Sequence, residues 1–156
     1  MYARGLLNLT LFHRASRVYV TLDRDATDRA ISIARTFGTR GRVLIPLEDL
    51  GPNGDLNDWL RVGAKGDPAT FRSILERALA ASPTPWALLI QRLPPDLAPW
   101  DLEDHIGVRE LFCEIGHQGP LSRDMHLRLL AERCGAPLAT LQEAARELAQ
   151  SSDTEL

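Results

Sequence analysis

Cysteine, lysine and long apolar runs are scarce in this chain of 156 residues. Its two cysteines, Cys113 and Cys134, lie far apart, and neither has a second Cys or His beside it at the spacing of metal ligands. A disulfide framework is thereby excluded, and the pattern indicates reduced thiols in a cytoplasmic protein. No run of about 18 apolar residues occurs, so we expect no membrane span. The N-terminal residues lack the organisation of a signal peptide, so we expect none.

The net charge of −3 conceals an uneven distribution of charge along the chain. Residues 1–47 hold eight arginines and three aspartates, a balance of +5, whereas residues 48–156 hold ten basic and eighteen acidic residues, a balance of −8. Of the 18 basic residues 17 are arginine, a bias that suits bidentate phosphate contacts but that genome composition can also produce. The candidate nucleic-acid contacts are Arg17, Arg24, Arg29, Arg40 and Arg42.

The first third of the chain predicts a βαβ unit. Residues 17–22 are rich in β-branched and aromatic side chains and predict a buried strand, and residues 42–46 predict a second strand that ends at its proline. Between them, residues 27–37 have apolar positions at helical spacing, with a terminating glycine behind. A right-handed crossover makes the two strands parallel. Residues 5–15 fit either a helix or a strand, and such a small sheet needs its edges covered by this segment, a second copy or a partner.

The rest of the chain predicts helices, which gives an α/β fold in which a small parallel βαβ sheet precedes an all-α helical bundle. We expect domain-like parts at 1–63 and 64–150 and a flexible tail at 151–156. Gly and Pro separate the expected helices, which are 56–62, 68–81, 84–93, 100–116, 121–134 and 137–150.

Several carboxylates are expected at the carboxyl edge of the two parallel strands, where open sheets bind ligands. Asp23 and Asp25 follow the first strand, and alternation along an extended segment would turn both to one side. Asp55 and Asp58 follow the second strand. Such a group suits Mg²⁺, which takes one or two carboxylates and keeps several waters. The alternative interpretation is that Asp25 and Asp55 only cap the helices that they precede.

The order of these pieces resembles the second half of the Toprim domain of bacterial-type DNA primases. The resemblance rests on a strand, the Asp23-x-Asp25 motif, a helix, a second strand and the segment GDLNDWL at 54–60. Residues 71–79 and 122–141 also look like the helical bundle that follows in that family. The resemblance departs at Thr27 and Asp28, where the family usually has a small residue and glycine, and no counterpart of the family's Glu-Gly motif precedes Arg17.

The resemblance implies a nucleotidyltransferase of the DNA primase type that makes RNA primers with Mg²⁺ or Mn²⁺. Asp23 and Asp25 would be its catalytic residues, and Asp23, Asp25 and Asp55 would bind the metal weakly. Because the glutamate-bearing half has no counterpart, we expect no turnover unless a missing N-terminal half or another chain completes the site. The implied partners are single-stranded DNA or a primer-template, and a replicative helicase. A non-catalytic scaffold for a replication partner, and a Toprim nuclease or topoisomerase fragment, are the alternatives.

Overall fold

The computed structural model describes residues 12–45, 55–95, 97 and 106–154. The chain forms two compact units, Met1–Pro85 and Trp86–Leu156. The units divide after Pro85, whereas the sequence analysis placed the boundary between the α/β part and the helical bundle at residue 63. Within the first unit, the Val43 N–H of the second strand donates to the Pro83 carbonyl at 3.0 Å, which ties residues near the end of that unit to its sheet.

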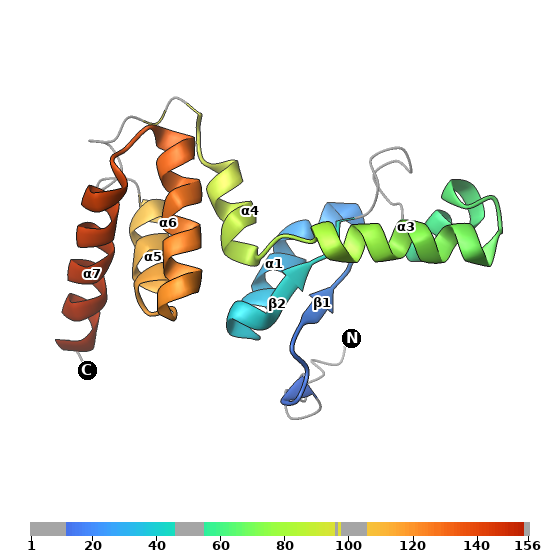
Figure 1. Ribbon diagram of the computed structural model, residues 1–156, viewed down its shortest axis with the longest axis horizontal. Coiled ribbons are helices and arrows are strands. Elements are labelled where there is room, and N and C mark those ends of the chain that lie inside the picture. The colour runs from blue at the N-terminus through green and yellow to red at the C-terminus, as the bar shows by residue number, and fades with distance from the viewer. Residues whose placement is uncertain (1–11, 46–54, 96, 98–105, 155–156) are drawn as a thin grey trace, which may run out of the picture. The chain divides into compact units, whose positions relative to one another are not determined.

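The N-terminal unit is built on the predicted βαβ arrangement. Strand β1 (Val18–Val20) and strand β2 (Gly41–Val43) pair in parallel, with Val18 opposite Gly41 and Val20 opposite Val43. The connecting helix α1 (Thr27–Arg35) packs against both strands (Figure 1). Apolar side chains on facing surfaces are buried between them, because alternate strand residues and one helical stripe point inward. They are Val18, Val20, Ala30, Ile31, Ala34 and Val43.

Two glycines shape the return from α1 to β2. Gly38 has φ of +58°, a conformation that favours glycine and allows the chain to leave the helix. It begins the short 3₁₀ helix η3 (Gly38–Arg40). At Gly41 the backbone lies so close to α1 that a Cβ atom would collide with the carbonyl oxygen of Ala34. A side chain at residue 41 would therefore separate the helix from the sheet.

The two edges of this two-stranded sheet differ in how far other segments cover them. The outer edge of β2 is partly covered by the chain itself, because the Val43 N–H is satisfied by Pro83. Along β1, none of the segments that the structure describes adds a further strand. The expectation that the N-terminal residues cover that edge falls on residues 1–11, which lie outside the described residues, as does the choice between helix and strand for most of 5–15.

After the sheet, three helical segments complete the N-terminal unit. A short turn of helix, α2 (Leu56–Asp58), continues into the π-helical turn η5 (Trp59–Gly63), which packs against α3 (Pro68–Ala81). Trp59 is fully buried. The N-cap of α3 is Asp67, whose carboxylate accepts the Thr70 N–H at 2.9 Å and the Thr70 hydroxyl at 2.5 Å.

The C-terminal unit is helical, as predicted. Its described helices are α4 (Pro85–Arg92), which begins at the boundary, α5 (Ile106–Gly116), α6 (Pro120–Cys134) and α7 (Leu138–Thr154). Helix α7 runs to Thr154, so the tail expected from residue 151 is helical over most of its length. Both cysteines are free thiols. Among the described helices, none combines the length and the apolar character needed to cross a membrane.

The core of the C-terminal unit is formed by α4, α5, α6 and α7. Val108, Ile115, Leu127, Leu130 and Ala145 are fully buried in it. Helices α5 and α7 approach closely at Gly116, where a Cβ atom would lie 2.5 Å from the Ala145 carbonyl oxygen. A buried polar group also belongs to this core. Its members are His126, which hydrogen-bonds Gln118 at 2.7 Å, and Trp86, whose ring contacts His126 and whose Nε1–H donates to Glu114 at 2.9 Å.

Candidate functional site

A pocket of about 200 Å³ lies at the carboxyl end of β1, within the N-terminal unit. The segment that leaves β1 supplies one wall, and the start of α2 supplies the other. We call it the acidic pocket, because it brings together Asp23 and Asp55, two of the three carboxylates that the sequence singles out as metal ligands. Its lining residues are Thr21, Leu22, Asp23, Asp55, Leu56 and Asn57.

Asp55 has the capping role that the sequence offered as an alternative, and it also lines the acidic pocket. Its backbone is extended, and its Oδ1 accepts the Asp58 N–H at 2.9 Å, which makes it the N-cap of α2. Its Oδ2 has no hydrogen-bond partner among the residues that the structure describes. Capping therefore fixes the orientation of the Asp55 carboxylate and leaves one oxygen for a ligand.

Asp23 is exposed, and its side chain has no hydrogen bond to any described residue. Its backbone carbonyl accepts the Ala26 N–H at 2.8 Å. This bond closes the 3₁₀ turn η2 (Arg24–Ala26) directly after Asp23. The turn therefore begins at Asp23, which lines the pocket beyond the carboxyl end of β1.

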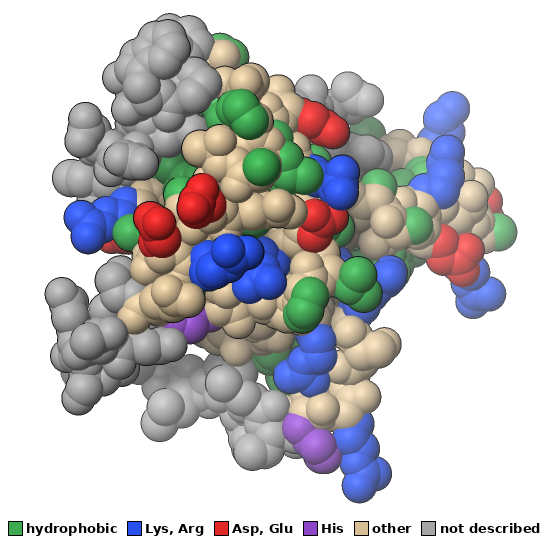
Figure 2. Space-filling model, turned by 60° about the vertical axis from the view of Figure 1, so that its left-hand side comes forward, with side chains coloured by type: hydrophobic (Ala, Val, Ile, Leu, Met, Phe, Trp, Pro, Cys, Tyr) green, Lys and Arg blue, Asp and Glu red, His purple; other side chains and the backbone are tan. Residues whose placement is uncertain are grey.

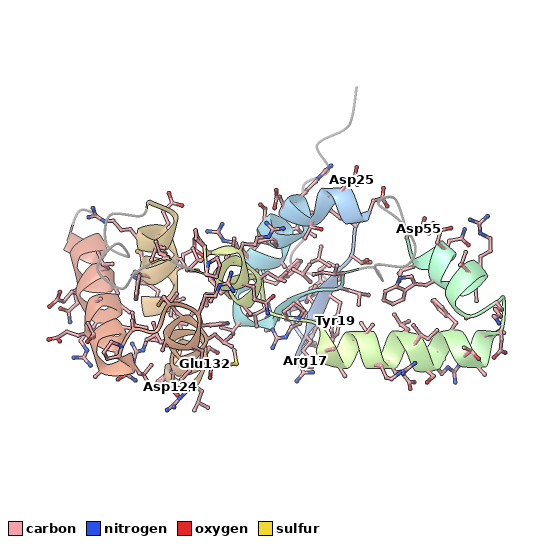
Figure 3. The ribbon with its side chains drawn as sticks, turned by 90° about the horizontal axis from the view of Figure 1, so that it is seen from above. Arg17, Tyr19, Asp25, Asp55, Asp124 and Glu132 are labelled. Atoms are coloured by element: carbon pink, nitrogen blue, oxygen red, sulfur yellow. The ribbon has the colours of Figure 1, made fainter. Side chains whose placement is uncertain are left out.

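The expected placement of Asp25 beside Asp23 on an extended segment is wrong. Asp25 lies in η2, where residues two apart do not share a side, and it is not among the residues that line the acidic pocket. Figure 3 shows Asp25 on the helical segment after β1 and Asp55 at the start of α2. The strand ends earlier than the alternation pattern assumed, because the Asp23 carbonyl begins the turn.

Asp58, the fourth carboxylate, is paired elsewhere: its Oδ1 accepts a hydrogen bond from Arg61 at 2.8 Å. Over the described parts of the chain, no three His, Cys, Asp or Glu side chains are grouped closely enough to hold one metal ion. Glu48 and Asp49 precede Asp55 in the segment after the second strand, and they lie outside the described residues.

The acidic pocket contains oxygen-bearing side chains of the kind that bind Mg²⁺ or Mn²⁺, but fewer carboxylates than a complete ligand set needs. Mg²⁺ commonly binds to one or two carboxylates and keeps several water molecules. Asp23 and Asp55 supply two carboxylates from separate segments, and Thr21 and Asn57 add a hydroxyl and an amide. Sequence reasoning missed Thr21 and Asn57, although Asn57 lies within the GDLNDWL segment. Two carboxylates without a third predict weak metal binding.

One of the candidate nucleic-acid contacts, Arg40, has a structural role. Nη1 of Arg40 donates to the carbonyl oxygens of Phe12, His13 and Ala15, at 3.0, 3.0 and 3.1 Å. The guanidinium thereby fastens the chain before β1 to the end of η3. The ring of Phe12 packs edge-on against Phe37 at a centroid distance of 5.5 Å and strengthens the same contact.

Arg17 and Arg42 lie near each other beside Tyr19. The register of the sheet pairs Tyr19 with Arg42. Partial burial, followed by the nearby positive charge of Arg17, lowers the pKa of Arg42 below its ordinary value. Nη1 of Arg42 donates to the carbonyls of Thr39 and Gly41, each at 2.7 Å. Figure 3 shows Arg17 and Tyr19 close together at β1.

Two further candidate arginines follow β1 in the chain. Arg29 is exposed on α1, and Arg24 lies in η2, with its side chain outside the described set. On the face drawn in Figure 2, Lys and Arg side chains occur singly or in small groups among acidic and hydrophobic ones.

Comparison with known proteins adds no relative: no family model, curated protein or solved structure matches the chain.

Proposed function

We propose that the N-terminal unit is a primase-like Toprim module of DNA replication that binds Mg²⁺ and a phosphate-bearing ligand at the acidic pocket. The observation that carries this proposal is the meeting of Asp23 and Asp55 in one pocket at the carboxyl end of a parallel strand. This is the edge at which α/β sheets bind ligands. The GDLNDWL segment, which carries the Toprim resemblance, supplies three of the six lining residues.

Asp23 and Asp55 would hold the metal, and Thr21 and Asn57 would hydrogen-bond its waters or the ligand. Mg²⁺ bound there would neutralise phosphate oxygens, which is the main requirement of phosphoryl transfer. Asp25, beside the pocket in sequence, is left without a direct role. Primer synthesis requires a further acidic group, so nucleotidyl transfer belongs to an assembly in which another segment or chain supplies the glutamate-bearing half of the domain.

Arg17 and Arg42 are the best-placed candidates for binding the backbone of single-stranded DNA or a primer-template. They add two positive charges beside an aromatic ring on the same strand pair. Phosphate contacts of this kind weaken steeply as salt rises. Among the residues that the structure describes, the hydrogen bonds of the Arg42 side chain use Nη1, so Nε and Nη2 are left for a phosphate.

The test is fluorescence anisotropy with a labelled single-stranded oligonucleotide, at low and moderate salt, with and without Mg²⁺. We expect salt-sensitive binding that Mg²⁺ strengthens. Asp23→Asn should abolish the Mg²⁺ effect, and Arg17→Gln with Arg42→Gln should weaken binding at both salt concentrations. Arg72→Gln is the matched control, since it removes an exposed arginine of α3 in the same unit that is not among the candidate contacts. No binding at low salt, where electrostatic contacts are strongest, would contradict the proposal and favour the scaffold alternative.

A further inference from the structure

A second pocket lies within the C-terminal unit, between α6 and α7, and has a volume of about 260 Å³. This is below the range of about 300–1,000 Å³ for sites that enclose drug-sized ligands, so it suits a small group. We call it the arginine pocket. Its lining residues are Pro120, Arg123, Asp124 and Leu127 of α6, and Gln142 and Arg146 of α7.

Two guanidinium groups of the arginine pocket, those of Arg123 and Arg146, have no hydrogen-bond or ion-pair partner among the described residues. Other arginines of the same unit are engaged: Arg133 donates to the Leu93 carbonyl, and Arg128 donates to Asp124. Arg123 and Arg146 come from different helices and face one cavity, so together they can approach a single ligand from two sides.

The carboxylate in the arginine pocket does not cancel these charges. Asp124 accepts a hydrogen bond from Nε of Arg128 at 2.7 Å through Oδ2 and one from Nε2 of Gln142 at 3.3 Å through Oδ1. The hydrogen bond between Arg128 and Asp124 raises the pKa of Arg128 above its ordinary value. Because Arg128 does not line the pocket and balances Asp124, the charges of Arg123 and Arg146 remain as a net positive charge inside it.

The start of α6 adds a weaker effect of the same sign. Pro120 and Arg123 belong to its first turn, and the N-cap, Gly119, offers no side chain to the free N–H groups. The N-terminal end of a long helix carries a partial positive charge, which favours a negatively charged ligand. The arginine pair and the cavity remain the features that select a ligand.

We propose that the arginine pocket binds a phosphate group. A carboxylate is satisfied by one guanidinium fork, whereas a tetrahedral phosphate presents further oxygens that a second guanidinium can reach. Gln142 lies beside them and fixes one side of the pocket through Asp124. The phosphate can come from a free phosphate or phosphomonoester, or from a nucleic-acid backbone, and these sources share the chemistry that the pocket recognises.

Isothermal titration calorimetry of the full chain with inorganic phosphate, in the presence of EDTA, tests this site apart from the acidic pocket. We expect saturable binding that Arg123→Gln with Arg146→Gln weakens about tenfold or more, a loss of about 1.4 kcal/mol. Arg109→Gln, which removes an exposed arginine of the same unit outside the pocket, should leave the affinity unchanged. Asp23→Asn should also leave it unchanged, because Asp23 belongs to the other pocket.

A short oligothymidylate distinguishes the two sources. If the oligothymidylate displaces bound phosphate at concentrations far below that of the phosphate, the site is assigned to a nucleic-acid backbone. If it does not displace phosphate, the site is assigned to a free phosphate or phosphomonoester. Non-saturable phosphate binding, or equal losses in the double variant and in Arg109→Gln, would overturn the proposal. If the double variant fails to fold, the arginine Nε–Hε resonances of the unmodified chain decide. Those of Arg123 and Arg146 should shift with phosphate, and their constancy would overturn it.

Discussion

Asp23 and Asp55 line one pocket although they belong to separate segments, the first leaving β1 and the second capping α2. The hydrogen bond from the Asp58 N–H to Asp55 fixes one of these carboxylates, and the turn that begins at the Asp23 carbonyl positions the other. Ordinary helix-forming interactions thus place two negative charges at one edge of the sheet. The same interactions exclude Asp25 from the pocket lining.

Arg40→Ala should destabilise the N-terminal unit. The guanidinium donates to three carbonyl oxygens that precede β1, and hydrogen bonds from charged groups contribute about 1.5–3 kcal/mol. Since Arg40 is only half-buried, we expect a loss of about 1–2 kcal/mol in the free energy of unfolding, measured by urea denaturation. Arg29→Ala should change it by less than about 0.5 kcal/mol. Equal effects of the two substitutions would show that Arg40 has no such structural role.

Gly41→Ala should disrupt the packing of α1 on the sheet. The new methyl group would collide with the Ala34 carbonyl oxygen, and backbone atoms cannot move aside as a flexible side chain can. Overpacking of this kind costs about 1–3 kcal/mol, and we expect a loss near the upper end of that range in thermal or urea unfolding. Gly63→Ala is the control, since a Cβ there would meet no atom within 4 Å. A variant at Gly41 as stable as the control would contradict the close approach.

Asp67 should make the stability of α3 depend on acid pH. Hydrogen bonds from the Thr70 side chain, the Thr70 N–H and the Ala69 N–H lower the pKa of Asp67 below its ordinary value. A lowered folded pKa means that the stabilisation is present above the unfolded pKa of about 4 and is lost as pH falls through the folded value. Asp67→Asn keeps a capping oxygen that does not titrate. Urea unfolding between about pH 6 and pH 3 should therefore show a smaller decline for Asp67→Asn than for the unmodified chain, and identical declines would contradict this assignment.

Local pattern predicted most of the elements, because hydrophobic periodicity and terminating residues act over a few positions. The strands around Tyr19 and Arg42 and the helix between them follow from it, and so does the left-handed glycine, Gly135, that ends α6. Helix α7 runs past the expected end, since residues 151–154 contain neither Gly nor Pro to stop it.

The interactions that the sequence did not reveal are those between distant segments. Pro83 accepts a hydrogen bond from Val43 of β2, and Arg40 donates to carbonyl oxygens that precede β1. Neither interaction leaves a local signal. The prediction that Asp25 lies on the same side as Asp23 was wrong for a different reason. The 3₁₀ turn η2 begins directly after Asp23, and it changes the side on which the next carboxylate lies.

The proposed function depends most directly on whether Asp23 and Asp55 bind a divalent cation. Titration of the full chain with Mn²⁺, followed by electron paramagnetic resonance of the free ion, measures it directly. We predict weak binding of one ion that Asp23→Asn and Asp55→Asn each reduce severalfold, whereas Asp25→Asn has little effect. Asparagine at residue 55 can still cap α2, so the loss would report on the metal and not on the helix. No Mn²⁺ binding, or binding that depends on Asp25 and not on Asp55, would contradict the account.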